Sequence, residues 1–264
     1  VFNASNREVD IEVFAAERDR LGLQVALVDR TLETALIGLQ GPHAQAILST
    51  LTPVDLEALA GYAFATATAA GRPAAVAGAR AFVSRTGYTG EDGFELMVEA
   101  ADAERVWSAL QEGGASPAGL GARDTLRTEA GFALYGHDID RTTNPYEARL
   151  GWVVNLDKPS FIGREALAQI KAAGPTRRIV GLRVAPGAVP RQGVPILEHG
   201  EPVGQVTSGT FSPTLKQNIA MGYVPVNLSQ KGLALSVEMR GKQAAAEVVS
   251  LPFVAHRSRP RAKM

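Results

Sequence analysis

The sequence predicts an α+β region followed by a carboxy-terminal all-β domain, an antiparallel barrel or sandwich. Up to about residue 171, helix-like and strand-like patterns are mixed along the chain. From about residue 177 onward, runs such as "IVGLRV" and "LALSVEM" alternate in strand fashion and break often at glycine and proline. We therefore expect an α+β domain at 1–174, a β domain at 175–257 and a basic, disordered tail at 258–264.

The first predicted element is a helix over residues 3–23. Ser5 and Glu8 have the spacing of a capping box, apolar residues recur at helical spacing, and Gly22 supplies an end signal. Asp10 then falls in an early turn, at the margin of the apolar stripe. A carboxylate there could take or hold a proton during chemistry, but the pattern alone favours a first-turn acid stabilised by the helix dipole.

The rest of the α+β region alternates strands and helices. Strands are predicted over 23–30, 34–42, 73–90 and 93–100, and helices over 43–51, 54–61, 102–114 and 122–132. The strands at 73–90 and 93–100 flank a glycine-rich turn, "TGEDG". This turn lacks the spacing and the lysine of a nucleotide-binding loop.

Composition restricts the possible partners and cofactors. Twenty-seven basic residues balance twenty-seven acidic ones, so no overall charge attracts nucleic acid or anionic lipid. The chain has no cysteine, and its four histidines lack metal-ligand spacing. No apolar run approaches the roughly 18 residues of a membrane span. We expect no metal site, no nucleic-acid partner and no membrane partner, and the first residue, Val1, indicates a fragment or a processed chain.

Glu95 is a candidate ligand-binding residue on the strand at 93–100. Side chains alternate along a strand, so Phe94 and Leu96 share one face, while Glu95 and Met97 share the other. A carboxylate on such a face could accept hydrogen bonds from a flat heterocycle with adjacent N–H groups. The same alternation is more typical of the solvated face of an antiparallel sheet.

Two arginines, four residues apart on the helix at 122–132, also have two possible roles. Arg123 and Arg127 project to one side of the helix and could meet a carboxylate-bearing ligand. They could equally pair with Asp124 and Glu129 at the surface, as such residues usually do.

Five blocks, in order along nearly the whole chain, resemble one family. They are "NASNREVD", "GYTGEDGFE", "GLGARDTLRTEAGFALYGHDID", "NPYEARLGWVV" and "TSGTFSPTLKQNIAMGYV". They resemble the T-protein of the glycine cleavage system, a tetrahydrofolate-dependent aminomethyltransferase. The resemblance implies a folate-binding catalytic region of the aminomethyltransferase type, here without the family's amino-terminal segment, followed by a carboxy-terminal β domain.

The resemblance also implies roles for four residues. Asp10 matches the family's catalytic aspartate, and Glu95 its pterin-contacting glutamate. Tyr88 resembles a lining residue of the same cavity, and Arg123 matches the folate-site arginine. Tetrahydrofolate would be the co-substrate and lipoylated H-protein the partner, in the bacterial cytoplasm or the mitochondrial matrix.

Two other functions remain open for a chain with this resemblance. One is the folate-binding part of a flavin-linked enzyme that oxidises sarcosine or dimethylglycine, although the chain carries no dinucleotide fingerprint. The other is a non-catalytic folate-binding relative, although such proteins lose the aspartate that Asp10 matches and alter the "GYTGEDG" block, and both are intact here.

Overall fold

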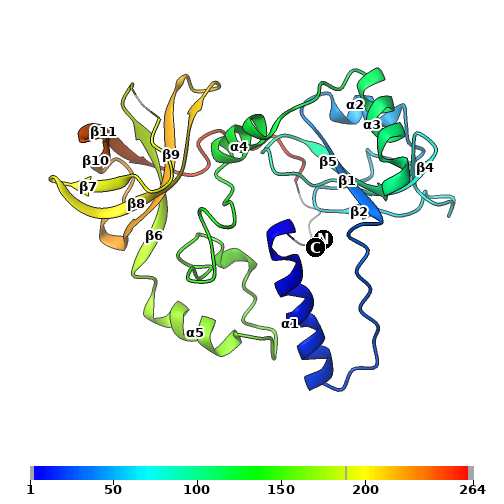
Figure 1. The fold of residues 1–264 in the computed structure, drawn as a ribbon, viewed down its shortest axis with the longest axis horizontal. Helices are drawn as coiled ribbons and strands as arrows, with labels where there is room; N and C mark the ends of the chain where they lie inside the picture. The colour runs from blue at the N-terminus through cyan, green and yellow to red at the C-terminus, as the bar shows by residue number, and fades with distance from the viewer. Residues whose placement is uncertain (1–2, 188, 261–264) are drawn as a thin grey trace.

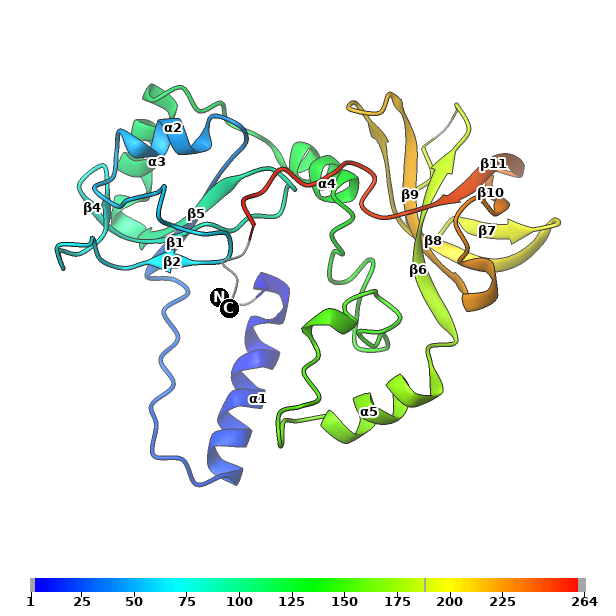
Figure 2. The same cartoon turned by 180° about the vertical axis from the view of Figure 1, so that it is seen from behind.

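The computed structural model describes residues 3–187 and 189–260. A β-sheet with its helices lies on one side of the molecule and a β-barrel on the other, with helix α4 (Leu120–Glu129) between them (Figures 1 and 2). Helix α1 (Arg7–Arg20) lies beside the sheet, and helix α5 (Arg164–Ala173) precedes the barrel (Figure 1). Short 3-10 helices cover Ala4–Asn6, Ala100–Asp102, Gly151–Val153 and Val226–Leu228.

The sheet is antiparallel and buries one face. Its strand order is β1 (Thr34–Gln40), β5 (Gly93–Glu99), β4 (Ala79–Ser84) and β2 (Phe64–Ala65), and β3 (Ala75–Val76) pairs with β4. Alternate residues of β5 pack into a core closed by α2 (Ala44–Ser49) and α3 (Ala103–Glu112). The opposite face, which carries Glu95 and Met97, looks away from this core.

The barrel is closed by six antiparallel strands. The strands are β6 (Arg177–Val184), β7 (Pro195–Glu198), β8 (Glu201–Ser212), β9 (Gln217–Pro225), β10 (Ala234–Met239) and β11 (Lys242–Val249). They pair in the order β10-β11-β6-β9-β8-β7. Val180, Leu182 and Val184 alternate into its core, as strand periodicity requires. The predicted fold class, an α+β region followed by an antiparallel β-barrel, is confirmed.

Three local predictions are wrong. Residues 23–30 are extended but pair with no strand of the described chain, and their apolar side chains are largely exposed. Residues 54–61 form turns rather than a helix, and the carbonyls of Leu56 and Leu59 accept hydrogen bonds from the buried Arg85 guanidinium instead of from helix N–H groups. The Ser5–Glu8 capping box is absent: Asn3 caps the first 3-10 turn by accepting from the Ser5 N–H.

The basic tail is ordered as far as the structure describes it. The Arg257 N–H donates to the Gly90 carbonyl at 2.7 Å, and the Pro260 carbonyl accepts from the Gly61 N–H at 3.1 Å. The Arg259 guanidinium lies 3.1 Å from the Glu57 carboxylate. These contacts hold the segment against the sheet, contrary to the disorder expected from its composition, while residues 261–264 lie outside the described residues.

Candidate functional site

Helix α4 carries the two candidate arginines into different environments. Arg123 is exposed, whereas the Arg127 side chain is 3% exposed. The Arg127 guanidinium donates to Asp124 at 2.6 and 2.8 Å, to Asp138 at 2.6 Å and to the Ser208 hydroxyl at 2.8 Å. Arg127 is therefore fully engaged within the protein: of the two acids named as alternative partners, Asp124 pairs with it and Glu129 does not.

Asp138 is the buried counterpart of Arg127. Its carboxylate also accepts from the Leu134 N–H at 2.9 Å, from Ser208 at 2.8 Å and from the Thr207 hydroxyl. These donors come from the loop after α4 and from β8, so one carboxylate joins helix, loop and barrel. A buried charge is tolerated when it is paired and hydrogen-bonded in this way.

A second buried carboxylate, Glu129, strengthens the same junction. It accepts from the Ser212 hydroxyl, from the Thr214 hydroxyl at 3.0 Å and from the Thr214 N–H at 3.3 Å. Neither Asp138 nor Glu129 was singled out as a functional residue by the sequence, because their partners lie on the barrel strand β8 or just beyond it, more than 65 residues away in the chain for the hydroxyl donors.

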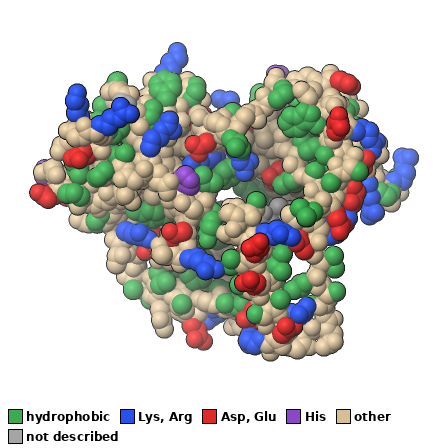
Figure 3. Space-filling view, viewed as in Figure 1, with side chains coloured by type: hydrophobic (Ala, Val, Ile, Leu, Met, Phe, Trp, Pro, Cys, Tyr) green, Lys and Arg blue, Asp and Glu red, His purple; other side chains and the backbone are tan. Residues whose placement is uncertain are grey.

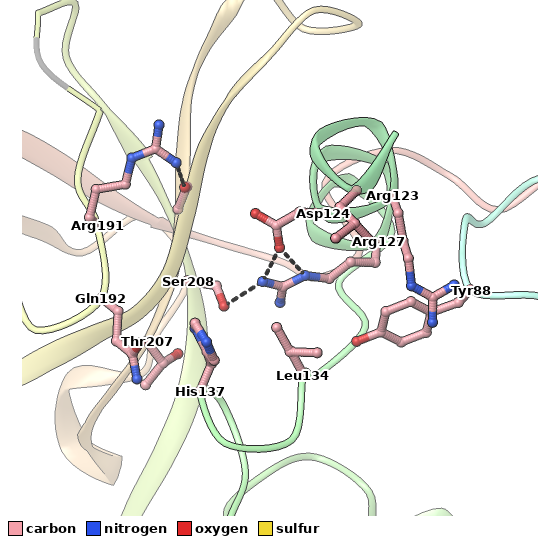
Figure 4. A pocket seen from close by; sticks show the side chains of 12 residues that line it. Tyr88, Arg123, Asp124, Arg127, Leu134, His137, Arg191, Gln192, Thr207 and Ser208 are labelled. Carbon is pink, nitrogen blue, oxygen red and sulfur yellow. Dashed lines mark hydrogen bonds and ion pairs between the residues drawn. The ribbon is translucent and has the colours of Figure 1, made fainter. Parts of the chain in front are cut away.

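A cavity of about 420 Å³ lies over this junction, between α4 and the barrel (Figure 4). Tyr88 and Arg123 line one side, with the guanidinium carbon 4.7 Å from the ring centroid. The Tyr88 hydroxyl donates to the Ala133 carbonyl at 2.5 Å, and its ring stacks on Phe132 at 5.6 Å. Burial raises the pKa of the Tyr88 hydroxyl, so it remains a donor at neutral pH.

Two arginines give this cavity its positive charge. Within the described chain no carboxylate pairs with Arg123, which leaves its guanidinium available to a ligand. Arg191 lies on the barrel side, where it donates to the Gly209 carbonyl at 3.1 Å (Figure 4). The structure thus brings Tyr88 and Arg123 together at one cavity, whereas Glu95 and Asp10 are not among the residues that line it.

Glu95 lies on the outer face of β5, half-buried. It stands opposite Gly38 on β1 and Ser84 on β4. The Thr86 hydroxyl donates to one carboxylate oxygen of Glu95 and lies 2.9 Å from the Ser84 hydroxyl. A Cβ atom placed on Gly38 would meet nothing within 4 Å, so the space beside Glu95 is open.

Asp10 lies on α1, half-buried, next in sequence to Ile11, which lines a larger cavity that Asp10 itself does not line. This cavity, about 670 Å³, is enclosed by Arg7, Ile11 and Phe14 of α1, by the segment after α1, and by Met97 and neighbours on the outer sheet face. Figure 3 shows the surface hollowed between sheet and barrel. No hydrogen bond or ion pair of the described residues joins Asp10 to Glu95, Tyr88 or Arg123.

Comparison with known proteins adds an independent finding. Residues 1–158 match the family model described as the GCVT N-terminal domain, and residues 177–255 match the glycine cleavage T-protein C-terminal barrel domain. The chain belongs to the glycine cleavage T-protein family. The family membership expected from the five sequence blocks is confirmed, and so is the enzyme class, aminomethyltransferase.

Relatives and solved structures agree with this membership. The chain is 49% identical to the aminomethyltransferase of Symbiobacterium thermophilum over 261 residues, covering 96% of this chain and 68% of the relative. It is 48% identical to that of Herpetosiphon aurantiacus, with the same coverage. The crystal structure of the glycine cleavage system aminomethyltransferase T from Bartonella henselae superposes with a TM-score of 0.82 at 34% identity, over 97% of this chain and 68% of that one. In the described part of this T-protein family member, no helix is long and apolar enough to cross a membrane.

Proposed function

We propose that this chain carries the folate site at which a one-carbon unit is transferred in glycine cleavage. The donor is the aminomethyl group on the dihydrolipoyl arm of H-protein, and the acceptor is tetrahydrofolate. The aminomethyl carbon forms two bonds to folate nitrogens and loses its bonds to sulfur and to the amine nitrogen. One folate proton goes to the thiol and the other to the departing ammonia, which leaves 5,10-methylenetetrahydrofolate.

The observation that carries this proposal is the open space beside the Glu95 carboxylate. One Glu95 oxygen is held by Thr86, which restrains the side chain on the sheet face. The residue opposite, Gly38, places no side chain beside the carboxylate. A carboxylate is a suitable acceptor for the adjacent ring N–H and amino groups of a pterin, because two parallel charge-assisted bonds can form.

Arg123 and Tyr88 supply complementary groups for the rest of the folate. Tyr88 is fixed by its hydrogen bond to Ala133 and by stacking on Phe132. The Arg123 guanidinium lies over the Tyr88 ring without a carboxylate partner in the described chain. We assign this pair to folate binding, since an unpaired guanidinium suits a carboxylate and the two planar groups suit an aromatic ring.

We assign proton handling to Asp10. It follows Arg7 by three residues and precedes Phe14 by four, so its side chain lies about 60° and about 40° around α1 from these two cavity-lining residues. There it would position and polarise the folate amine that accepts the one-carbon unit. The bacterial relatives favour a bacterial cytoplasmic setting, with the mitochondrial matrix as the counterpart in a eukaryote.

The test is the substitution Asp10→Asn, assayed with aminomethylated H-protein and tetrahydrofolate. We expect turnover to fall by about 10²–10⁴-fold, the usual contribution of a positioned acid or base, while folate affinity measured by calorimetry changes little. Asp19→Asn is the matched control, because Asp19 lies on the same helix and, among the residues that the structure describes, its carboxylate pairs only with the adjacent Arg18. Unchanged turnover in Asp10→Asn would remove Asp10 from the mechanism.

A further inference from the structure

A separate cavity of about 420 Å³ lies at the end of the barrel where β6 begins and β11 ends. We call it the barrel-end cavity. It shares no lining residue with the cavity that holds Tyr88 and Arg123. Its polar lining residues are Tyr146, Arg149, Arg178, Ser229, Lys231 and Ser250.

The barrel-end cavity concentrates positive charge without any carboxylate in its lining. Arg149 comes from the loop before the 3-10 helix at 151–153, Arg178 from β6, and Lys231 from the turn before β10. Among the described residues, none of these three side chains has an ion pair or a hydrogen bond. Glu147, two residues before Arg149 in the chain, is already paired with Arg177 at 3.2 Å. Three cations that line one cavity without carboxylate partners repel one another, and a bound anion would relieve this repulsion.

Hydroxyl groups accompany the three cations. The Tyr146 hydroxyl is buried and has no hydrogen-bond partner in the described chain. Buried polar groups nearly always have a partner, so this hydroxyl, which belongs to a residue that lines the cavity, is an unused donor. The Ser229 hydroxyl donates to the Val226 carbonyl at 2.7 Å and keeps its oxygen lone pairs, and Ser250 is exposed at the cavity mouth.

We propose that the barrel-end cavity binds a phosphate group, either as inorganic phosphate or on a small phosphate monoester. Phosphate is compact, doubly charged near neutral pH and rich in acceptor oxygens, and guanidinium groups bind it through paired hydrogen bonds. The volume lies within the usual range for small-molecule sites, so a short organic group fits beside the phosphate. The barrel-end cavity is independent of the proposed folate site, because different residues line it. Phosphate binding there requires no step of the transfer reaction.

The test is calorimetric titration of the chain with inorganic phosphate and, separately, with glycerol phosphate, at ionic strength matched with potassium chloride. We expect saturable binding of one ligand per chain. Tighter binding of the ester would identify an organic phosphate as the ligand, and equal binding would identify phosphate itself. Lys231→Gln and Arg178→Gln should each weaken binding about tenfold, as loss of one charge-assisted contact predicts.

Two controls make the result decisive. Lys242→Gln removes an exposed charge on β11 outside the cavity and should leave the affinity unchanged. Lys231 lies in a turn, so its substitution leaves the barrel strands intact even if Arg178→Gln disturbs β6. Tyr146→Phe should weaken binding without lowering the thermal stability of the free protein, because its hydroxyl has no partner to lose. Binding that never saturates, or that Lys231→Gln and Lys242→Gln change equally, would overturn the proposal.

Discussion

Asp138→Asn removes one charge from the junction between α4 and the barrel, and we expect it to destabilise the protein strongly. The Arg127 and Asp138 side chains are 3% and 0% exposed, so the substitution leaves a buried guanidinium without its fully buried charged partner. Breaking a buried pair in this way costs about 3–5 kcal/mol. Arg127 keeps its contacts with Asp124 at 2.6 and 2.8 Å, which places the expected loss at about 3 kcal/mol, the lower end of that range.

The hydrogen-bond count supports the same magnitude. The carboxylate of Asp138 accepts from four donors on three segments, whereas an asparagine amide offers one acceptor oxygen and presents its own N–H groups to the rest. At least one buried donor is left unsatisfied, and such a donor typically costs about 1–3 kcal/mol.

Urea unfolding followed by tryptophan fluorescence measures the effect. With an m-value of about 3 kcal/mol per molar, a loss of about 3 kcal/mol moves the midpoint down by about 1 M. Asp140→Asn is the matched control, since Asp140 lies two residues away and is exposed to solvent, and within the described chain its carboxylate bonds only to the neighbouring threonines at 142 and 143. Its midpoint should stay close to that of the unsubstituted chain. Equal midpoints for the two variants would show that the buried pair does not hold α4 to the barrel.

Three further predictions address the folate site, the loss of stability at acid pH and the domain organisation. Glu95→Gln should weaken tetrahydrofolate binding by about 1–3 kcal/mol in a calorimetric titration, and unchanged affinity would return Glu95 to a solvated sheet face. The Arg85 guanidinium holds the pKa of Asp92 below its ordinary value, so this pair stabilises the fold above about pH 4 and its contribution disappears as the pH falls through the lowered pKa. As the pH falls below about 4, the free energy of unfolding of Asp92→Asn should therefore decrease less than that of the unsubstituted chain. Equal decreases in the two proteins would contradict this. We also propose a domain boundary between residues 174 and 175, so limited proteolysis should leave 175–257 intact longer than the exposed connections around it. A first cut within a barrel strand, identified by mass spectrometry, would argue against that boundary.

Patterns that depend on one buried face were predictable from the sequence. In β5, Phe94, Leu96 and Val98 are buried in the sheet core while Glu95 is half-buried on the other face, as strand alternation requires. The barrel was predictable for the same reason, because each of its strands presents alternate residues to one interior. These signals are local: they need only the period of the strand and the presence of a core.

Patterns that depend on a distant partner were not predictable. Residues 23–30 alternate like a strand, but no described strand lies beside them, so Val25 and Val28 remain largely exposed. Residues 54–61 have the composition of a helix, but Leu56 and Leu59 pack in the sheet core and their carbonyls accept from Arg85, which is distant in the chain. In both segments tertiary contacts, rather than propensity, decide the conformation.

The two arginines of α4 show the same limit within the candidate site. Their four-residue spacing correctly predicts a shared side of the helix, and Asp124 is near enough in sequence to be named as a partner. What distinguishes them is Asp138, which reaches Arg127 only because the loop after α4 turns back at Gly136, where φ is +86°. Arg127 is thereby neutralised by two carboxylates within the protein, and it contributes little field to the cavity. The positive charge that a folate carboxylate would meet must therefore come from Arg123 and Arg191, so Arg123→Gln should reduce ligand affinity while leaving the α4–barrel junction in place.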